Sequence, residues 1–274
     1  MLNILVPTDF SELSKVAIRY ALDMAKKMKG KVTLLHVVDT GEHGSSMRFR
    51  LNSLMAEMVR IAEEDFERVL AEIKEYNKTG KSIRYEIIQS SSFLKAVSKF
   101  AKKSRANLIV MGTHGASGLK KVVMGSNTAS MLEGCDVAVL AVPAKGVYKS
   151  KKAVVYATDL LNTQKELKKI LAIIGSEKPL IHVLHVATDR KGAKEAEAKV
   201  DKIVGKVGYG NVLVRVLVNK DPAPAINEYV KKMKVDLLTL FPHQHSFLEK
   251  LFKGSVTKQL TYQNSVPLLA FKQS

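Results

Sequence analysis

Cysteine and long apolar runs are what this sequence has least of. Cys135 is the single cysteine in 274 residues, so no disulfide can form within the chain, which fits a reducing cytoplasm. No segment approaches the roughly 20 consecutive apolar residues that a membrane-spanning helix needs. The first residues, MLNILVPTDF, carry no basic group ahead of their apolar stretch, so we expect a strand there and not a signal peptide. We therefore expect a cytoplasmic protein with no membrane association.

Aromatic residues are also scarce, at 6% of the chain, whereas basic residues are abundant. Lys and Arg number 44 against 26 Asp and Glu, which gives a formal net charge of +18 spread over both halves. Such a charge attracts polyanions without specificity. Because there is no zinc-knuckle spacing and no aromatic ribonucleoprotein motif, a specific nucleic-acid partner is not expected. We interpret lysine clusters such as Lys149–Lys152 as solvated surface or linker.

The chain aligns with itself after a shift of about 150 residues. The matching segments are ILVPTD (4–9) with VVYATD (154–159), LLHV (34–37) with VLHV (183–186), and LKKVVMGSNT (119–128) with LEKLFKGSVT (248–257). A Lys- and Ser-rich stretch, Lys145–Lys152, lies between the copies and suits a linker. The sequence therefore predicts two similar domains, over residues 1–146 and 151–274.

Short β-branched runs alternate with segments of helical period in each copy, which is typical of βαβ units and a parallel sheet. For the first copy we predict strands at 2–7, 31–38, 82–88, 107–111 and 137–142, and helices at 12–29, 47–77, 92–104 and 126–134. Right-handed crossovers then place helices on both faces of a five-stranded parallel sheet. The predicted class is α/β, with two tandem doubly wound, Rossmann-like domains.

A glycine-rich loop follows the predicted strand 107–111. It begins with Gly112-Thr113-His114-Gly115 and, after nine residues, ends at Gly125-Ser126, where a helix is expected to begin. A strand, a glycine loop and a helix start place backbone N–H groups around an anion, and the helix dipole adds to the attraction. The pattern predicts a site for nucleotide phosphates, to which His114 contributes either a contact or only a solvent-exposed ring.

Three separate motifs, which occur in the same order along the chain as in the family, resemble those of the universal stress protein family over residues 1–143. The pattern G-x-x-G-x9-G-S resembles the ATP-binding signature of that family, ILVPTDFS (4–11) resembles its first strand and acidic turn, and HVVD (36–39) resembles the end of its second strand. The resemblance implies a fold of the adenine nucleotide alpha hydrolase-like type. Ligands of doubly wound sheets bind at the carboxyl ends of the strands, so these separate motifs should converge on one crevice.

The resemblance implies that the first domain binds ATP, or ADP or AMP, as a regulatory ligand in stress response, with Mg²⁺ or Mn²⁺ bridging the phosphates. Asp9 would contact the nucleoside and Val37 the adenine edge through its backbone; the alternative for Asp9 is that it only supports the helix that Ser11 caps. The candidate nucleotide-binding residues are Pro7, Thr8, Asp9, Val37, Met111, Gly112, His114, Gly115, Gly125, Ser126 and Asn127. No residue is assigned a catalytic or metal-ligating role.

The second copy departs from the signature. Gly112 and Gly115 align with Phe241 and Gln244, and Phe241-Pro242 places bulk, and a residue without an N–H, where backbone should meet phosphate. We predict a degenerate second domain that binds ATP weakly or not at all. The resemblance also implies that the two domains form an intramolecular pseudo-dimer through their last strands, and that two chains can form a homodimer.

Two other functions stay open at this point. One is slow ATP hydrolysis or phosphotransfer, which would need a positioned base, yet no acidic residue occurs between Met111 and Met131. The other is a nucleotide-free module whose basic surface docks polyanions or protein partners.

Overall fold

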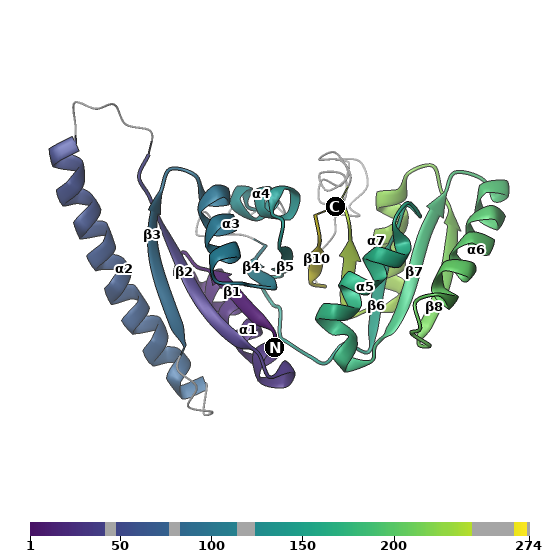
Figure 1. Cartoon of the computed structure of the whole chain (residues 1–274), viewed down its shortest axis with the longest axis horizontal. Helices are drawn as coiled ribbons and strands as arrows, with labels where there is room; N and C mark the ends of the chain where they lie inside the picture. The colour runs from purple at the N-terminus through teal and green to yellow at the C-terminus, as the bar shows by residue number, and fades with distance from the viewer. Residues whose placement is uncertain (42–47, 77–82, 114–123, 243–265, 273–274) are drawn as a thin grey trace. The chain divides into compact units, whose positions relative to one another are not determined.

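The computed structural model describes residues 1–41, 48–76, 83–113, 124–242 and 266–272. Its described residues divide into two compact units, an N-terminal unit that ends at Tyr148 and a C-terminal unit that begins at Lys149 (Figure 1). Within the described residues, no helix combines the length and the apolar character that crossing a membrane requires.

The N-terminal unit alternates strands and helices along its whole length. Its elements are β1 (Asn3–Pro7), α1 (Glu12–Met28), β2 (Lys31–Asp39), α2 (Arg48–Tyr76), β3 (Arg84–Ser90), α3 (Phe93–Lys103), β4 (Leu108–Gly112), α4 (Ser126–Gly134) and β5 (Ala138–Val142). The strands pair in parallel in the order β3-β2-β1-β4-β5. The chain therefore moves outward from β1 in one direction and returns to the other side at β4, so the strand order reverses between β1 and β4.

Helices cover both faces of this sheet. On one face, α1 contacts α2 through Lys15 and Glu72, whose Nζ and Oε1 atoms lie 2.9 Å apart. On the other face, α3 packs on α4 so closely that a Cβ added to Gly134 would lie 2.9 Å from Cδ2 of Leu94. The alternation follows from right-handed crossovers on either side of the reversal. Strands β4 and β5 are almost entirely buried, as strands covered on both faces should be.

The C-terminal unit repeats this plan with shorter elements. They are β6 (Ala153–Ala157), α5 (Thr163–Ile174), a short 3₁₀ helix (Gly175–Glu177), β7 (Leu180–Ala187), α6 (Arg190–Gly205), β8 (Val212–Val218), α7 (Pro222–Met233), β9 (Leu237–Leu240) and β10 (Leu268–Ala270). The parallel order is β8-β7-β6-β9-β10, which corresponds strand for strand to the N-terminal unit. The predicted α/β class with two five-stranded parallel sheets is confirmed.

Two details differ from the sequence predictions. The third strand occupies Arg84–Ser90 and not 82–88, because its pairing with β2 continues to the match of Asp39 with Ser90. Lys151, which we expected in a solvated linker, is only 5% exposed. Its Nζ donates to the carbonyl oxygen of Lys149 (2.6 Å), and burial lowers the pKa of its ammonium group.

Candidate functional site

A cavity of about 240 Å³ lies at the carboxyl ends of the strands where the strand order reverses. We call it the N-terminal cavity. It is lined by residues from five separate segments: Pro7, Thr8, Asp9, Ser14, His36, Val37, Phe93, Met111, Gly112, Gly125, Ser126, Asn127 and Thr128. Nine of these are the predicted site residues that fall in the described part of the chain. His114 and Gly115 lie outside the described residues.

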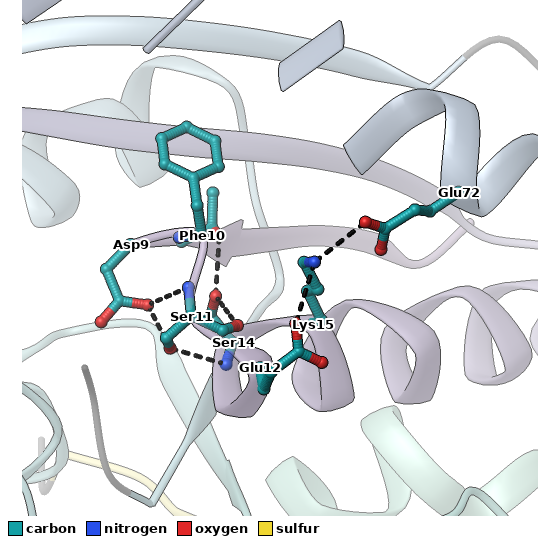
Figure 2. Close-up of polar contacts among 8 residues, drawn as sticks. Asp9, Phe10, Ser11, Glu12, Ser14, Lys15 and Glu72 are labelled. Carbon is teal, nitrogen blue, oxygen red and sulfur yellow. Dashed lines mark hydrogen bonds and ion pairs between the residues drawn. The ribbon is translucent and has the colours of Figure 1, made fainter. Parts of the chain in front are cut away.

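The turn after β1 is held by its own side chains (Figure 2). Asp9 Oδ1 accepts from the backbone N–H of Ser11 (3.1 Å) and from its hydroxyl (2.6 Å). Ser11 caps α1, since its Oγ accepts from the N–H of Ser14 (3.2 Å). Asp9 thus supports the residue that caps the helix and also lines the cavity. The two alternatives for Asp9, support of the helix start and contact with a ligand, do not exclude each other, because both use the same position.

Phe10 occupies the left-handed region, with φ of 62°, a conformation that non-glycine residues rarely adopt. Its N–H donates to Thr8 Oγ1 (3.0 Å), and Thr8 Oγ1 also lies 3.0 Å from Ser14 Oγ. Phe10 packs edge-on against Phe66 of α2, with ring centroids 4.8 Å apart. These contacts hold an unfavourable backbone conformation at the edge of the cavity, as is common at binding sites.

His36 joins the first two strands of the site. Its Nδ1 donates to the carbonyl oxygen of Thr8 (2.8 Å), which fixes the tautomer, because a carbonyl can only accept. In the neutral ring, Nε2 is then the acceptor. This hydrogen bond gives His36 a structural role. His36 also lines the cavity, although it is not among the candidate residues from the sequence.

The opposite end of the cavity is formed by the start of α4. Gly125 is the N-cap residue, and no side chain caps this helix. The first N–H groups of any helix lack carbonyl partners within the helix, and the helix dipole is positive there. Gly125 is anchored by its own N–H, which donates to the carbonyl oxygen of Thr113 (2.9 Å), and Thr128 Oγ1 donates to the carbonyl oxygen of Gly112 (2.8 Å). The end of β4 and the first turn of α4 are therefore fixed to each other.

Chemically, the cavity has two different ends. One offers a carboxylate, a histidine and the backbone of β2, which suit a ring with hydroxyl and N–H groups. The other offers helix N–H groups and small residues, which suit an anion. The sequence analysis missed Ser14, His36, Phe93 and Thr128. Phe93 is the first residue of α3 and Thr128 lies in the first turn of α4, so the rule that doubly wound sheets bind ligands beside helix starts could have pointed to both.

Comparison with known proteins shows the family of the chain. The universal stress protein family model matches residues 1–143 and again residues 149–272. The chain belongs to the universal stress protein family. It carries two copies of the family domain, in the tandem form.

Curated relatives of this universal stress protein include both tandem and single-domain proteins. Universal stress protein Slr1230 of Synechocystis is 23% identical over 295 residues, an alignment that covers 99% of this chain and all of that protein. Universal stress protein MJ0531 of Methanocaldococcus jannaschii is 30% identical over 146 residues, 52% of this chain and 84% of that protein. Among solved structures, a universal stress protein from Archaeoglobus fulgidus superposes with a TM-score of 0.65 at 18% identity and covers 99% of this chain and 98% of its own. That likeness supports the fold of the tandem.

Proposed function

We propose that the N-terminal unit of this universal stress protein binds ATP or another adenine nucleotide as a regulatory ligand. The observation that carries the proposal is the convergence of nine predicted residues, from four segments, on the N-terminal cavity. Motifs as far apart in the sequence as residues 7 and 127 thus lie around one cavity, which supports a common ligand.

The two ends of the cavity fit the two ends of a nucleotide. The first turn of α4, from Ser126, would hold the phosphates through backbone N–H groups. Asp9 would accept from the ribose hydroxyls, and the backbone of Val37 would face the adenine edge. The Ser126 hydroxyl adds a further donor near the phosphates.

A divalent ion, Mg²⁺ or Mn²⁺, would be held mainly by the phosphates. Within the part of the chain that the structure describes, no group of three or more His, Cys, Asp or Glu side chains is placed to hold a metal. Mg²⁺ commonly keeps several water ligands and binds through substrate phosphates with few protein ligands. The protein side chains therefore contribute little to the metal in this proposal.

Turnover is not part of the proposal. Asp9 is the single carboxylate among the described residues that line the cavity, and it lies at the end assigned to the nucleoside. A base for hydrolysis must reach the water that attacks the γ-phosphate. We propose binding and not hydrolysis as the principal activity. Pairing of the two domains, formation of a homodimer and a cytoplasmic location stay predictions.

Gly125→Val tests the proposal. The backbone at Gly125 has φ of −60° and ψ of 142°, which valine adopts readily, so the variant should fold. Its side chain would project at the helix start where phosphate is expected. We expect ATP affinity, measured by titration calorimetry with Mg²⁺, to fall at least about a hundredfold, or about 2.7 kcal/mol.

Gly210→Val is the matched control, because a Cβ added at Gly210 meets no atom within 4 Å. It should bind ATP as the unaltered protein does. Equal ATP binding by Gly125→Val and by the unaltered protein would overturn the assignment. ATP affinity could instead fall steeply as the salt concentration rises and be the same in Gly125→Val as in the unaltered protein. The binding site would then be the basic surface and not the cavity.

A further inference from the structure

The C-terminal unit has a cavity of its own at the position equivalent to the N-terminal cavity. We call it the C-terminal cavity. Its volume is about 270 Å³, and it is lined by Ala157, Thr158, Asp159, Leu184, His185, Val186, Pro222, Ile226, Leu240 and Phe241. These residues come from the ends of β6 and β9, from β7 and from the start of α7. The cavity thus lies where doubly wound sheets bind ligands.

One end of this cavity repeats several hydrogen bonds of the N-terminal cavity. The N–H of Thr158 donates to the carbonyl oxygen of Leu184 (2.9 Å), and in the first copy the N–H of Thr8 donates in the same way to the carbonyl oxygen of Leu35 (2.8 Å). Nδ1 of His185 donates to the carbonyl oxygen of Thr158 (2.8 Å), the same contact and distance as in the first copy.

The turn after β6 also keeps its unusual backbone. Leu160 has φ of 69° and donates its N–H to Thr158 Oγ1 (3.0 Å), as Phe10 does to Thr8. Asp159 Oδ1 accepts from the N–H of Leu161 (3.0 Å). A non-glycine residue in the left-handed region is unfavourable in free energy. The second copy therefore retains both the recognition groups and the strained turn that positions them.

The other end of the cavity has changed its chemistry. Phe241 takes the place of Gly112, and its ring stacks on Phe271 with centroids 4.7 Å apart and planes 6° apart. Tyr156 packs edge-on against the same ring at 6.1 Å. Pro242, which has no N–H, follows. At this end of the cavity, the buried aromatic ring of Phe241 and the proline that follows it stand where backbone N–H groups could otherwise bind phosphate. We call this end the aromatic wall.

The remaining lining also disfavours an anion. Among the described residues that line the cavity there is no lysine or arginine, and Asp159 contributes a carboxylate. At the start of α7, Pro222 lacks an N–H and Asp221 already caps the helix by accepting from Ala223 (3.3 Å). Lys169 Nζ lies 5.9 Å from the centroid of the Phe241 ring, and Lys169 is not among the described lining residues.

The phenylalanine at the position of Gly112 has not closed the cavity, although protein interiors otherwise pack densely. A mostly apolar pocket with a few convergent polar groups is typical of a small-molecule site. We propose that the C-terminal cavity binds an uncharged, planar heteroaromatic molecule with O–H or N–H donors and no phosphate. Phe241, Leu240 and Val186 contact the ring, while Asp159 and Nε2 of His185, the acceptor in the neutral ring, receive its donors. This inference does not depend on ATP binding by the N-terminal unit.

Adenosine is the probe, because it carries a planar ring, hydroxyl donors and no charge. The full-length chain is saturated with ATP and Mg²⁺, adenosine is then titrated by calorimetry, and hydrogen exchange is followed by mass spectrometry. We expect one adenosine per chain, with slowed exchange in peptides that cover 157–161 and 184–187. ATP alone should leave exchange in these peptides unchanged.

Ala157→Leu adds bulk to the wall of the cavity and should weaken adenosine binding at least tenfold, while ATP binding to the N-terminal unit stays within twofold. Ala153→Leu, at the other end of β6 and outside the cavity lining, is the matched control and should bind adenosine normally. Absence of adenosine protection in the C-terminal peptides of the unaltered chain would overturn the proposal, whether or not Ala157→Leu folds. Protection of the same peptides by ATP would overturn the exclusion of phosphate. Failure of ATP to bind the N-terminal unit would count against the proposed function alone.

Discussion

The two cavities of this chain share a scaffold and differ at one end. Both place a Thr-Asp turn, a histidine hydrogen-bonded to that turn and the end of a central strand around a cavity of similar volume, about 240 and 270 Å³. At the end of the fourth strand, the N-terminal unit has Gly112 and the C-terminal unit has Phe241. The comparison teaches that the two ends of such a site can change independently, because they lie on different strands of one rigid sheet.

The units also differ beside the turn. In the N-terminal unit, the 29-residue α2 brings Phe66 against Phe10 and stacks it on Tyr85, with centroids 4.4 Å apart. The corresponding helix of the C-terminal unit, α6, has 16 residues, and the residue equivalent to Phe10 is Leu160. The turn keeps its left-handed residue in both units. The contact between Phe10 and Phe66 therefore supports this conformation but is not required for it.

The largest effect should come from removing the aromatic wall of the C-terminal unit. Phe241 is 6% exposed and stacks on Phe271, so Phe241→Ala should lower the free energy of unfolding of that unit by about 3 kcal/mol. Hydrogen exchange in β6 and β9 would measure the loss. ATP binding by the N-terminal unit should not change. A loss below about 1 kcal/mol would mean that the ring fills space without stabilising the unit.

The second largest effect should come from placing the C-terminal residue, phenylalanine, at the corresponding position of the N-terminal cavity. Gly112→Phe installs in the N-terminal unit the residue that the C-terminal unit carries, and should weaken ATP binding by about a hundredfold, or about 2.7 kcal/mol. Calorimetry measures the affinity, and circular dichroism confirms the fold. If the variant bound ATP normally, the glycine-to-phenylalanine change would not explain the difference between the two cavities.

The smallest effect concerns the contact between α1 and α2 next to the N-terminal cavity. Lys15 Nζ lies 3.0 Å from Glu12 and 2.9 Å from Glu72 (Figure 2). Because Glu72 is half exposed, Glu72→Gln should cost only about 0.5 kcal/mol in chemical denaturation. A loss above about 2 kcal/mol would show that the contact holds α2 in place, and a matched Glu57→Gln variant, on the exposed Arg60 pair, gives the baseline.

This contact also has a pH dependence with a definite sign. The hydrogen bond from Lys15 to the Glu72 carboxylate raises the pKa of Lys15 above its ordinary value of 10.5. Its contribution to stability is therefore full below pH 10.5 and is lost as the pH rises through the higher pKa of the folded state. The difference between the unaltered protein and Glu72→Gln should narrow above that pH.

Local patterns in the sequence predicted most of the fold. The runs ILVP (4–7) and LIVM (108–111) are short, continuous and apolar, as is typical of strands covered on both faces. The duplication of ILVPTD as VVYATD then implied the second unit. Lys151 could not be predicted in the same way, because its burial depends on packing against residues that are distant in sequence, including Glu177, which accepts from its backbone N–H (2.8 Å).

By itself, the sequence determined the α/β class, the duplication, the family resemblance and the residues that gather in the N-terminal cavity. Periodicity, glycine spacing and strand order are properties of neighbouring residues, and the carboxyl ends of parallel strands must share one edge of a sheet. Only the tertiary structure decided that Ser14, His36, Phe93 and Thr128 complete that cavity, and that Phe241 stacks on Phe271 beside a second cavity. Side-chain packing depends on all the surrounding elements at once, and no local pattern specifies it.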